Sequence, residues 1–429
     1  MDFVIKDKCV VKYTGKGGVV DIPQGIEIIG ETAFNKSAAE VINIPKGVKS
    51  INSGAFCACT KLKTVNISET VEFIGDNVFY GDIYLTEINV ASKNPFFKSV
   101  NGVLYDKEMK TLLVCPKKVS GIFAVPEGIE EIKELSFDGC SGITEIKLPS
   151  SVNKIGGRAF WGCAKLEKIN ISKNIKKLPN SVFYNCAALK EFTVPEGIEE
   201  IADRVFGYCF YLKKAVIAKS VKKIGENCFR DCFRLEEVIL PEGLESIGSW
   251  AFFDCYKLKS ITIPKSVKYL GEDVFGYCKE LAKVEVLSEK LDDESFYSLS
   301  DLKEETDVSI FSVPSENVWG NLDQNNKNRF IKYAFKNIKS LKTEIKMKYA
   351  QYIKENITAF IPHLCTFADI SILEFLAQEN IINNDTMDLF LDFTEENPQA
   401  KAWIVDYLGR NVQSASDSLD LALDEILSL

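Results

Sequence analysis

The stretch "NCFRDCFRLEEVILPEGLESIG" at residues 227–248 decides the fold, because its pattern recurs along the chain. Two of its cysteines lie four residues apart, and Phe229 precedes and Phe233 follows the second one. Similar stretches are "RAFWGCAKLEKINISKNIKKL" (158–178), "SVFYNCAALKEFTVPEGIEEI" (181–201), "RVFGYCFYLKKAVIAKSVKKI" (204–224) and "WAFFDCYKLKSITIPKSVKYL" (250–270). The opening stretch is therefore one unit of a repeat, and its cysteines must be interpreted as repeat positions before they are assigned to a site.

Each repeat is anchored by one phenylalanine and contains one short apolar strand. From Phe137 onward every step between anchors is 23 residues, whereas the step from Phe79 to Phe137 is 58 and indicates an insertion. Alternate apolar residues in the V-x-I segment predict a short strand with one inward face. A single coil cannot bury that face alone, so neighbouring coils must stack. The anchors are Phe34, Phe56, Phe79, Phe137, Phe160, Phe183, Phe206, Phe229, Phe252 and Phe275.

These repeats resemble the BspA-like branch of the leucine-rich repeat proteins. A proline closes the strand in several coils, and an "I-G-x-x-A-F" segment leads into the next coil. The resemblance covers roughly residues 1–297 and implies a right-handed solenoid of about eleven coils. It also implies adhesion or host-protein binding where such proteins are exported. Together with a helical C-terminal region, it predicts an α+β chain.

Most of the thirteen cysteines belong to the repeat. Cysteine suits such a position because it is a small buried residue with a weak donor. A metal or redox role is the alternative, but recurrence once per coil favours packing, and Cys228 replaces the Ala or Val of other coils. We therefore expect free, buried thiols, as in a reducing compartment. The repeat cysteines are Cys59, Cys140, Cys163, Cys186, Cys209, Cys232, Cys255 and Cys278.

Three parts of the chain are expected. Residues 1–22 form an N-terminal hairpin that covers the open end of the solenoid, with Asp7-Lys8 as its turn. Residues 23–297 form the solenoid, with a hairpin insertion near 94–118 whose Asn101-Gly102 is a strong turn signal. Residues 315–429 have helical periodicity. Helices are expected at 328–341, 369–380, 397–411 and 414–427.

No motif for catalysis, cofactor or metal binding is present in the sequence. The single histidine, His363, cannot build a two-histidine metal site, and "GKGG" at 15–18 lacks the ending of a phosphate loop. A net charge of −9 argues against nucleic acid as a partner. We therefore expect a non-catalytic protein-binding or scaffolding protein. An enzyme acting through the helical region is the least favoured alternative.

The compartment follows from what the chain contains. The N-terminus has no run typical of a signal peptide, and no segment of about 18 uninterrupted apolar residues predicts a membrane span. The chain as it stands is expected to be cytoplasmic. The alternative is an exported surface adhesin that binds host protein or glycan, if a leader is missing or export is leaderless.

Two anomalies suggest a binding surface on the coils from Phe206 to Phe275. On the outward strand face, the row Asn170, Thr193, Val216, Ile239 and Thr262 becomes apolar at Val216 and Ile239. The neighbouring row, Glu145, Lys168, Glu191, Lys214 and Glu237, alternates in charge and is expected to satisfy itself.

The second anomaly is aromatic. Phe210, Phe233 and Tyr256 follow the repeat cysteine in three successive coils, where earlier coils have alanine, and Trp161 and Tyr184 lie between anchor and cysteine. Clustered aromatic residues outside the core favour a contact surface for a protein, or a glycan. The alternative is that these rings stack on one another and seal the loop side of the solenoid.

Overall fold

The computed structural model describes residues 2–288, 291–292, 295, 299, 302, 306–310, 343–355, 370–383, 386 and 402–407. The chain forms two compact units. The first comprises Met1–Lys259 with Gly271–Leu281, and the second comprises Ser260–Leu270 with Ala282–Leu429.

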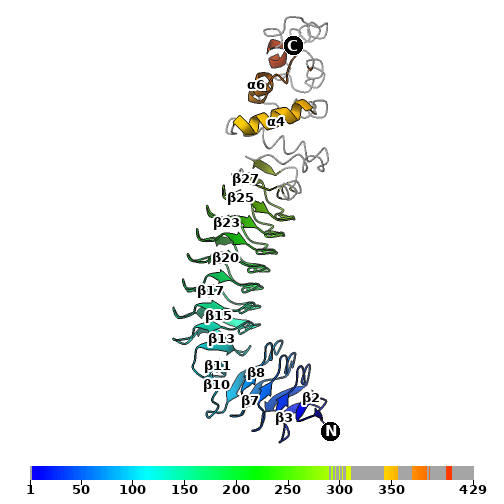
Figure 1. Cartoon of the computed structure of the whole chain (residues 1–429), viewed down its shortest axis with the longest axis vertical. Coiled ribbons are helices and arrows are strands. Elements are labelled where there is room, and N and C mark those ends of the chain that lie inside the picture. The colour runs from blue at the N-terminus through cyan, green and yellow to red at the C-terminus, as the bar shows by residue number, and fades with distance from the viewer. Residues whose placement is uncertain are drawn as a thin grey trace. The chain divides into compact units, whose positions relative to one another are not determined.

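The first unit is a stack of short strands, one coil after another (Figure 1). Two parallel series run along its N-terminal coils. One series contains β1 (Phe3–Lys6), β2 (Cys9–Tyr13), β4 (Ile28–Ile29), β6 (Ser50–Ile51) and β8 (Phe73–Ile74). The other contains β3 (Gly18–Asp21), β5 (Ala39–Asn43), β7 (Thr64–Ile67) and β9 (Glu87–Val90).

The same two series resume after the insertion. The insertion and the strands that continue it are β10 (Phe97–Val100), β11 (Val103–Asp106), β12 (Thr111–Val114), β14 (Glu131–Ile132) and β16 (Lys154–Ile155). The second series resumes with β13 (Ser120–Ala124), β15 (Gly142–Lys147), β17 (Lys168–Ile169), β19 (Glu191–Thr193), β21 (Lys214–Val216) and β23 (Glu237–Ile239). The first resumes with β18 (Lys177–Leu178), β20 (Glu200–Ile201), β22 (Lys223–Ile224) and β24 (Ser246–Ile247).

Register follows the repeat length. Glu191, Lys214 and Glu237 are aligned partners in β19, β21 and β23, so each residue pairs with its equivalent in the next coil. The chain is thus a mostly β solenoid of about 12 turns.

The anchor phenylalanines fill the core, and from Phe160 to Phe275 their rings stack face to face. The ring centroids of Phe160 and Phe183 are 5.6 Å apart with 8° between their planes, and those of Phe229 and Phe252 are 5.3 Å apart at 6°. All four side chains are fully buried. Burying one such side chain contributes about 1.5–3 kcal/mol, and an aromatic pair adds about 0.5–1.5 kcal/mol. The stack therefore couples each coil to both of its neighbours.

The repeat cysteines form a second ladder beside the phenylalanines. Seven of the eight thiols donate to the carbonyl of the anchor phenylalanine one coil back, for example Cys209 Sγ to Phe183 O at 3.2 Å and Cys232 Sγ to Phe206 O at 3.1 Å. Cys140, which follows the insertion, donates instead to Cys115 O at 3.5 Å and Pro116 O at 3.6 Å. Burial raises the pKa of Cys209 to about 12, so this thiol stays protonated. All eight repeat cysteines are buried and free, which confirms the structural interpretation and explains the recurrence.

Hairpins occur at both of the positions that the sequence indicates. β1 and β2 pair antiparallel, and the turn residues Asp7 and Lys8 have φ values of 49° and 60°. Tyr13 of this hairpin stacks on Phe34 with centroids 4.9 Å apart, so an aromatic ring lies over the first anchor. β10 and β11 also pair antiparallel, and Asn101-Gly102 forms their turn with φ values of 50° and 78°.

The second unit continues the strands beyond the expected end of the repeat. β28 pairs parallel with β27 and lies beyond residue 297, where the sequence predicts the end of the solenoid. The strands of this unit are β25 (Ser260–Ile263), β26 (Tyr269–Leu270), β27 (Lys283–Val286) and β28 (Asp307–Ile310).

Helical residues are described in the second unit at Ser295 and Leu299 and at three longer places. The three longer ones are α4 (Thr343–Glu355), α6 (Ile370–Gln378) and residues 402–407. The last two fall within the expected helices at 369–380 and 397–411. The expected helices at 328–341 and 414–427, and His363, lie outside the described residues. No helix in the described part of the chain is long and apolar enough to cross a membrane.

Candidate functional site

The three predicted ring residues lie together on one row. Phe210 and Phe233 stack with centroids 5.2 Å apart at 12°, and Phe233 and Tyr256 stack with centroids 4.9 Å apart at 17°. All three side chains are half-buried. Because each follows a buried cysteine, the cysteine ladder sets the spacing of the rings at one coil.

Trp161 and Tyr184 join the same row through Tyr208, which also lies between an anchor phenylalanine and its repeat cysteine. Trp161 contacts Tyr184 edge to face, with centroids 5.4 Å apart at 77°. Tyr184 contacts Tyr208 at 5.0 Å, and Tyr208 contacts Phe210 at 5.8 Å. Six rings over five coils thus form a continuous set, which we call the aromatic row: Trp161, Tyr184, Tyr208, Phe210, Phe233 and Tyr256.

Neighbouring residues cover most ring faces in the row. Both faces of Phe233 are covered by Phe210 and Tyr256. The ammonium of Lys279 lies 3.8 Å from the ring centroid of Tyr256, and the Arg158 guanidinium lies 5.2 Å from that of Trp161. The row therefore offers ring edges and cationic groups to solvent rather than open faces.

A further cation–aromatic pair lies beside the row. Tyr211 directly follows Phe210, and the Arg234 guanidinium, which directly follows Phe233, lies 4.4 Å from the Tyr211 ring centroid. Both side chains are exposed. Sequence reasoning missed this pair, although the second position after the repeat cysteine was a readable signal.

Val216 and Ile239 lie on the strand face instead. They are direct partners in β21 and β23, Ile239 is 43% exposed, and Val216 is half-buried. In the N-terminal coils the same outward row is a hydrogen-bonded ladder of Asp21, Asn43, Asn66 and Asn89. The apolar pair therefore replaces side chains that elsewhere bond from coil to coil.

In the charged row, lysine and glutamate side chains of neighbouring coils form ion pairs. Lys214 lies 2.7 Å from Glu237, and Lys168 lies 3.9 Å from Glu145. Exposed pairs of this kind contribute about 0–1 kcal/mol each. This row supplies register between coils rather than a site.

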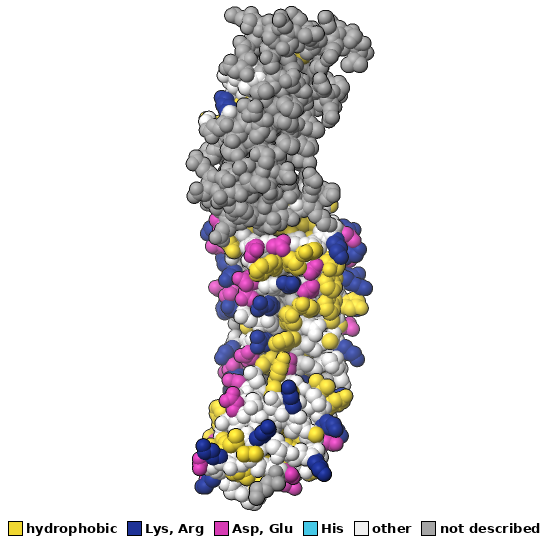
Figure 2. All heavy atoms as spheres, turned by 90° about the vertical axis from the view of Figure 1, so that its right-hand side faces the viewer, with side chains coloured by type: hydrophobic (Ala, Val, Ile, Leu, Met, Phe, Trp, Pro, Cys, Tyr) yellow, Lys and Arg dark blue, Asp and Glu magenta, His cyan; other side chains and the backbone are white. Residues whose placement is uncertain are grey.

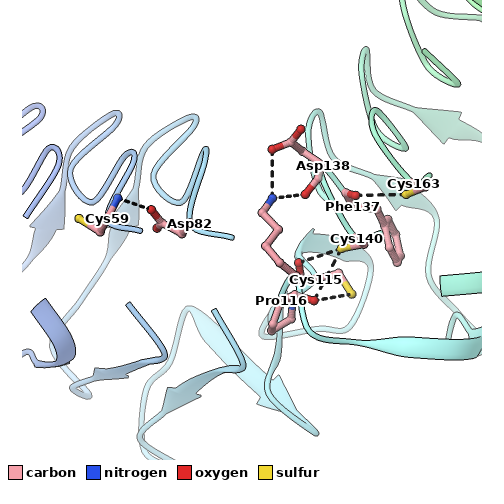
Figure 3. Close-up of polar contacts among 9 residues, drawn as sticks. Cys59, Asp82, Cys115, Pro116, Phe137, Asp138, Cys140 and Cys163 are labelled. Carbon is pink, nitrogen blue, oxygen red and sulfur yellow. Dashed lines mark hydrogen bonds and ion pairs between the residues drawn. The ribbon is translucent and has the colours of Figure 1, made fainter. Parts of the chain in front are cut away.

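Sequence reasoning missed a cluster of buried charges at the insertion (Figure 3). Asp82 occupies the repeat cysteine position of its coil, three residues after Phe79, and its Oδ1 accepts the Cys59 N–H at 2.7 Å. Its Oδ2 is buried and has no hydrogen-bond partner among the described residues. Burial raises the pKa of the Asp82 carboxyl from 3.8 to about 8, although the Cys59 N–H and the Lys117 charge both lower it.

Lys117 and Asp138 form the other part of this cluster. The Lys117 ammonium contacts the backbone carbonyl of Asp138 and lies 3.1 Å from its carboxylate. The Lys117 side chain is only 5% exposed. A cavity of about 430 Å³ lies beside them, between residues 73–80 and residues 113–138.

No group of histidine, cysteine and carboxylate side chains within the described ranges could hold a metal ion. The repeat thiols donate hydrogen bonds to backbone carbonyls of the neighbouring coil. The described surface has two features suited to contact with a partner. One is the row of ring edges with its neighbouring cations, and the other is the cavity beside the insertion.

Comparison with known proteins assigns the family. The family described as "BspA type Leucine rich repeat region (6 copies)" matches residues 16–101, 119–236 and 200–315. The chain belongs to this family of leucine-rich repeat proteins, whose members typically bind proteins. No curated protein is similar enough to count as a match.

Solved structures of similar sequence are bacterial leucine-rich repeat proteins. A leucine rich cell surface protein from Faecalibacterium prausnitzii is 31% identical with a TM-score of 0.49, over 52% of this chain and 59% of that one. A leucine-rich repeat protein from Eubacterium ventriosum is 24% identical with a TM-score of 0.49, over 63% of this chain and 88% of that one. The pneumococcal vaccine antigen PcpA is 23% identical with a TM-score of 0.46, over 68% of this chain and 73% of that one. This chain thus spans less than two thirds of the Faecalibacterium protein.

Proposed function

We propose that this chain is a non-catalytic protein-binding module whose aromatic row contacts the partner. The observation that carries the proposal is the continuity of the row: six rings in five successive coils touch one another and reach the surface half-buried. Tyrosine, tryptophan, phenylalanine and arginine are the residues enriched at protein interfaces. Desolvating their exposed parts contributes about 25 cal/mol per Å² before ordering costs are subtracted.

The ring geometry favours a protein partner over a glycan. A sugar ring stacks on an open aromatic face, but the faces of Phe233 are covered by its neighbours and one face of Tyr256 carries Lys279. Ring edges flanked by cations suit apolar and acidic side chains of a protein. The rigid stack also limits the side-chain entropy lost on binding, because each ring is already held by the next.

The state of the thiols supports a reducing compartment. Twelve described cysteines are free, and the repeat thiols donate to backbone carbonyls instead of forming disulfides. Free thiols in this number are typical of proteins that remain in a reducing environment. An exported adhesin is the competing assignment, and fractionation of cells that express the chain with its native upstream sequence distinguishes the two.

The experiment that tests the aromatic row compares captured proteins rather than capture itself. The full chain is immobilised beside a triple variant, Phe210→Leu, Phe233→Leu and Tyr256→Leu, which keeps apolar volume but removes the ring edges. The matched control is Val19→Ser with Ile122→Ser, which removes two exposed apolar side chains from strands β3 and β13.

We expect quantitative mass spectrometry to show at least one protein that is retained by wild type and control. Its recovery should fall about tenfold on the triple variant, which corresponds to about 1.4 kcal/mol. Identical recovery on all three columns would exclude the row as the contact surface. A triple variant that no longer melts cooperatively would instead assign the rings to sealing the loop side.

A further inference from the structure

The N-terminal coils are joined by a regular ladder of backbone hydrogen bonds on their turn side. Every second N–H of one turn donates to a carbonyl of the next coil, at distances between 2.7 and 3.3 Å. The donor and acceptor pairs are Thr32 to Ser53, Phe34 to Ala55, Lys36 to Cys57, Gly54 to Asp76, Phe56 to Val78 and Ala58 to Tyr80.

This ladder stops at the coil of Phe79. The next donors in sequence are the N–H groups of Asn77, Phe79 and Gly81, each 23 residues after its equivalent. None of them has an acceptor in the part of the chain that the structure describes. The coil therefore ends in a row of three unused donors.

Strand β8 of the same coil is the last strand of its sheet, so it also has backbone groups without a partner strand among the described residues. The carbonyl of Ile29 accepts the Asn52 N–H, and that of Ile51 accepts the Gly75 N–H, both across the ladder. The next equivalent is Ile74 of β8, and β8 pairs with β6 alone. The Ile74 carbonyl thus has no following strand among the described residues.

The insertion explains why this edge is open. The hairpin supplies acceptors to β9, where Gly102 O accepts the Ile88 N–H at 2.9 Å and Ser99 Oγ accepts the Val90 N–H at 3.0 Å. The hairpin thus contacts the last strand of the β9 sheet, while its own strands belong to the sheet of β12, β14 and β16, and β8 has no further neighbour among the described strands. One face of the interrupted coil is covered, and the other is not.

In the described part of the chain, residues 113–117 accept no hydrogen bond from this edge, and two of their own donors bond to the coil beyond them. Cys115 N–H donates to Ser136 O at 2.7 Å. The Lys117 ammonium donates to Asp138 O, and this contact is drawn at Asp138 in Figure 3. Between regular coils a backbone N–H donates to the carbonyl of the next coil, and here the buried Lys117 ammonium is the donor instead. The unused groups that remain lie on one side, at β8 and the turn that follows it.

Apolar side chains surround this edge. The cavity of about 430 Å³ is lined by Phe73, Ile74, Tyr80, Phe97, Leu113 and Val114, among others. Phe73 is 55% exposed and Tyr80 is 40% exposed, beside further exposed side chains at Ile83, Tyr84 and Phe96. On the face drawn in Figure 2, hydrophobic side chains of the described residues gather in bands between charged ones. Large ligand sites fall between about 300 and 1,000 Å³, so the volume suits a short chain segment.

We propose that this cleft binds an extended polypeptide segment of a partner protein. It is formed by residues 73–80 on one side and by Phe97, residues 113–117 and residues 133–138 on the other. The unused groups of residues 74–81 include both N–H donors and a carbonyl acceptor, and an extended backbone carries both in alternation. An anion would supply hydrogen-bond acceptors but no donor, and an apolar ligand would supply neither donors nor acceptors. Main-chain bonds to β8 and its turn hold the segment, and Phe73, Tyr80 and Phe97 contact its side chains. The cleft is a second surface and does not depend on the aromatic row.

The first test uses amide hydrogen exchange on the full chain. The N–H groups of Phe79 and Gly81 should exchange at least about tenfold faster than those of Phe56 and Ala58, their bonded equivalents. Equal protection in the free chain would overturn the proposal, because the chain would then close its own cleft.

The second test pans a phage library of random peptides of about 12 residues against the full chain. Selected peptides should slow exchange at Phe79 and Gly81 and should bind about tenfold more weakly to Phe73→Ser. Binding to Ile122→Ser and to Phe233→Leu should change less than about twofold, which separates the cleft from exposed apolar surface and from the aromatic row. Peptides that leave these amides fast, or no peptide with Kd below about 100 μM, would overturn the proposal.

Discussion

Replacing Asp82 by asparagine should stabilise the protein at neutral pH and remove most of its pH dependence between pH 4 and 8. The folded chain raises the pKa of this carboxyl from 3.8 to about 8 because it is buried. In the unfolded chain the carboxylate ionises freely, so the folded state loses stability as pH rises from about 4 to 8. Below pH 4 both states are protonated, and above pH 8 both are ionised, so stability is flat at each end.

The magnitude follows from the size of that shift. Each pKa unit corresponds to about 1.4 kcal/mol, so the interval from pH 4 to pH 7 corresponds to roughly 4 kcal/mol. Local relaxation around a buried carboxylate reduces this ceiling, and we expect Asp82→Asn to gain about 2–4 kcal/mol at pH 7. Asparagine keeps an oxygen that can accept the Cys59 N–H, so the hydrogen bond of 2.7 Å is retained.

The assay is urea unfolding followed by far-UV circular dichroism between pH 4 and pH 9. The control is Asp76→Asn. Asp76 lies six residues before Asp82 and is exposed, so this substitution should leave the dependence of stability on pH unchanged. A wild-type stability that does not fall between pH 4 and 8, or an Asp82→Asn profile parallel to wild type, would refute the buried-carboxyl argument.

Three further outcomes follow from the core and from the charged row. Phe229→Ala should cost about 3–5 kcal/mol in urea unfolding, because the ring is fully buried and stacks on Phe206 and Phe252; a cost below about 1 kcal/mol would contradict coupling through the stack. Thiol titration without reductant should find most of the thirteen cysteines reactive in denaturant and the repeat cysteines unreactive in the native chain, whereas mostly paired cysteines would contradict the packing role. A double-mutant cycle on Lys214 and Glu237 should give a coupling of about 0.2–1 kcal/mol that falls with salt, and a larger, salt-independent value would contradict their exposed placement.

The repeat could be predicted from the sequence because each of its features is local and recurs. The anchor phenylalanine recurs from coil to coil, the cysteine three residues later recurs in eight of ten coils, and most coils have a V-x-I strand. Stacking is the only way for every coil to bury its apolar side. The Asn101-Gly102 turn was predictable for the same reason, since two residues decide its backbone.

The open edge at β8 could not be predicted, because it depends on which sheet the insertion joins. The 58-residue step shows that a coil is interrupted, but not that the hairpin bonds to Ile88 and Val90 of β9 and leaves β8 uncovered. Asp82 was visible as a break in the cysteine register. Its burial and shifted pKa, in contrast, arise from packing against the neighbouring coil.

The aromatic row shows the same division. Phe210, Phe233 and Tyr256 stand out in sequence because they replace alanine at one repeat position. Tyr208 connects them to Tyr184 only through side-chain directions, which the repeat does not determine. Whether the rings seal the loop side or meet a partner is a question of exposure, and the structure leaves them half-buried.

Hydroxyl-radical footprinting of the full chain with a captured partner tests the central claim most directly, because side-chain oxidation reports exposure ring by ring. We predict that oxidation of Tyr211, Phe233 and Tyr256 falls at least about threefold in the complex, while that of Val19 and Ile122 is unchanged. Equal oxidation of the three aromatic residues with and without the partner would contradict the claim that this solenoid binds protein through its aromatic row.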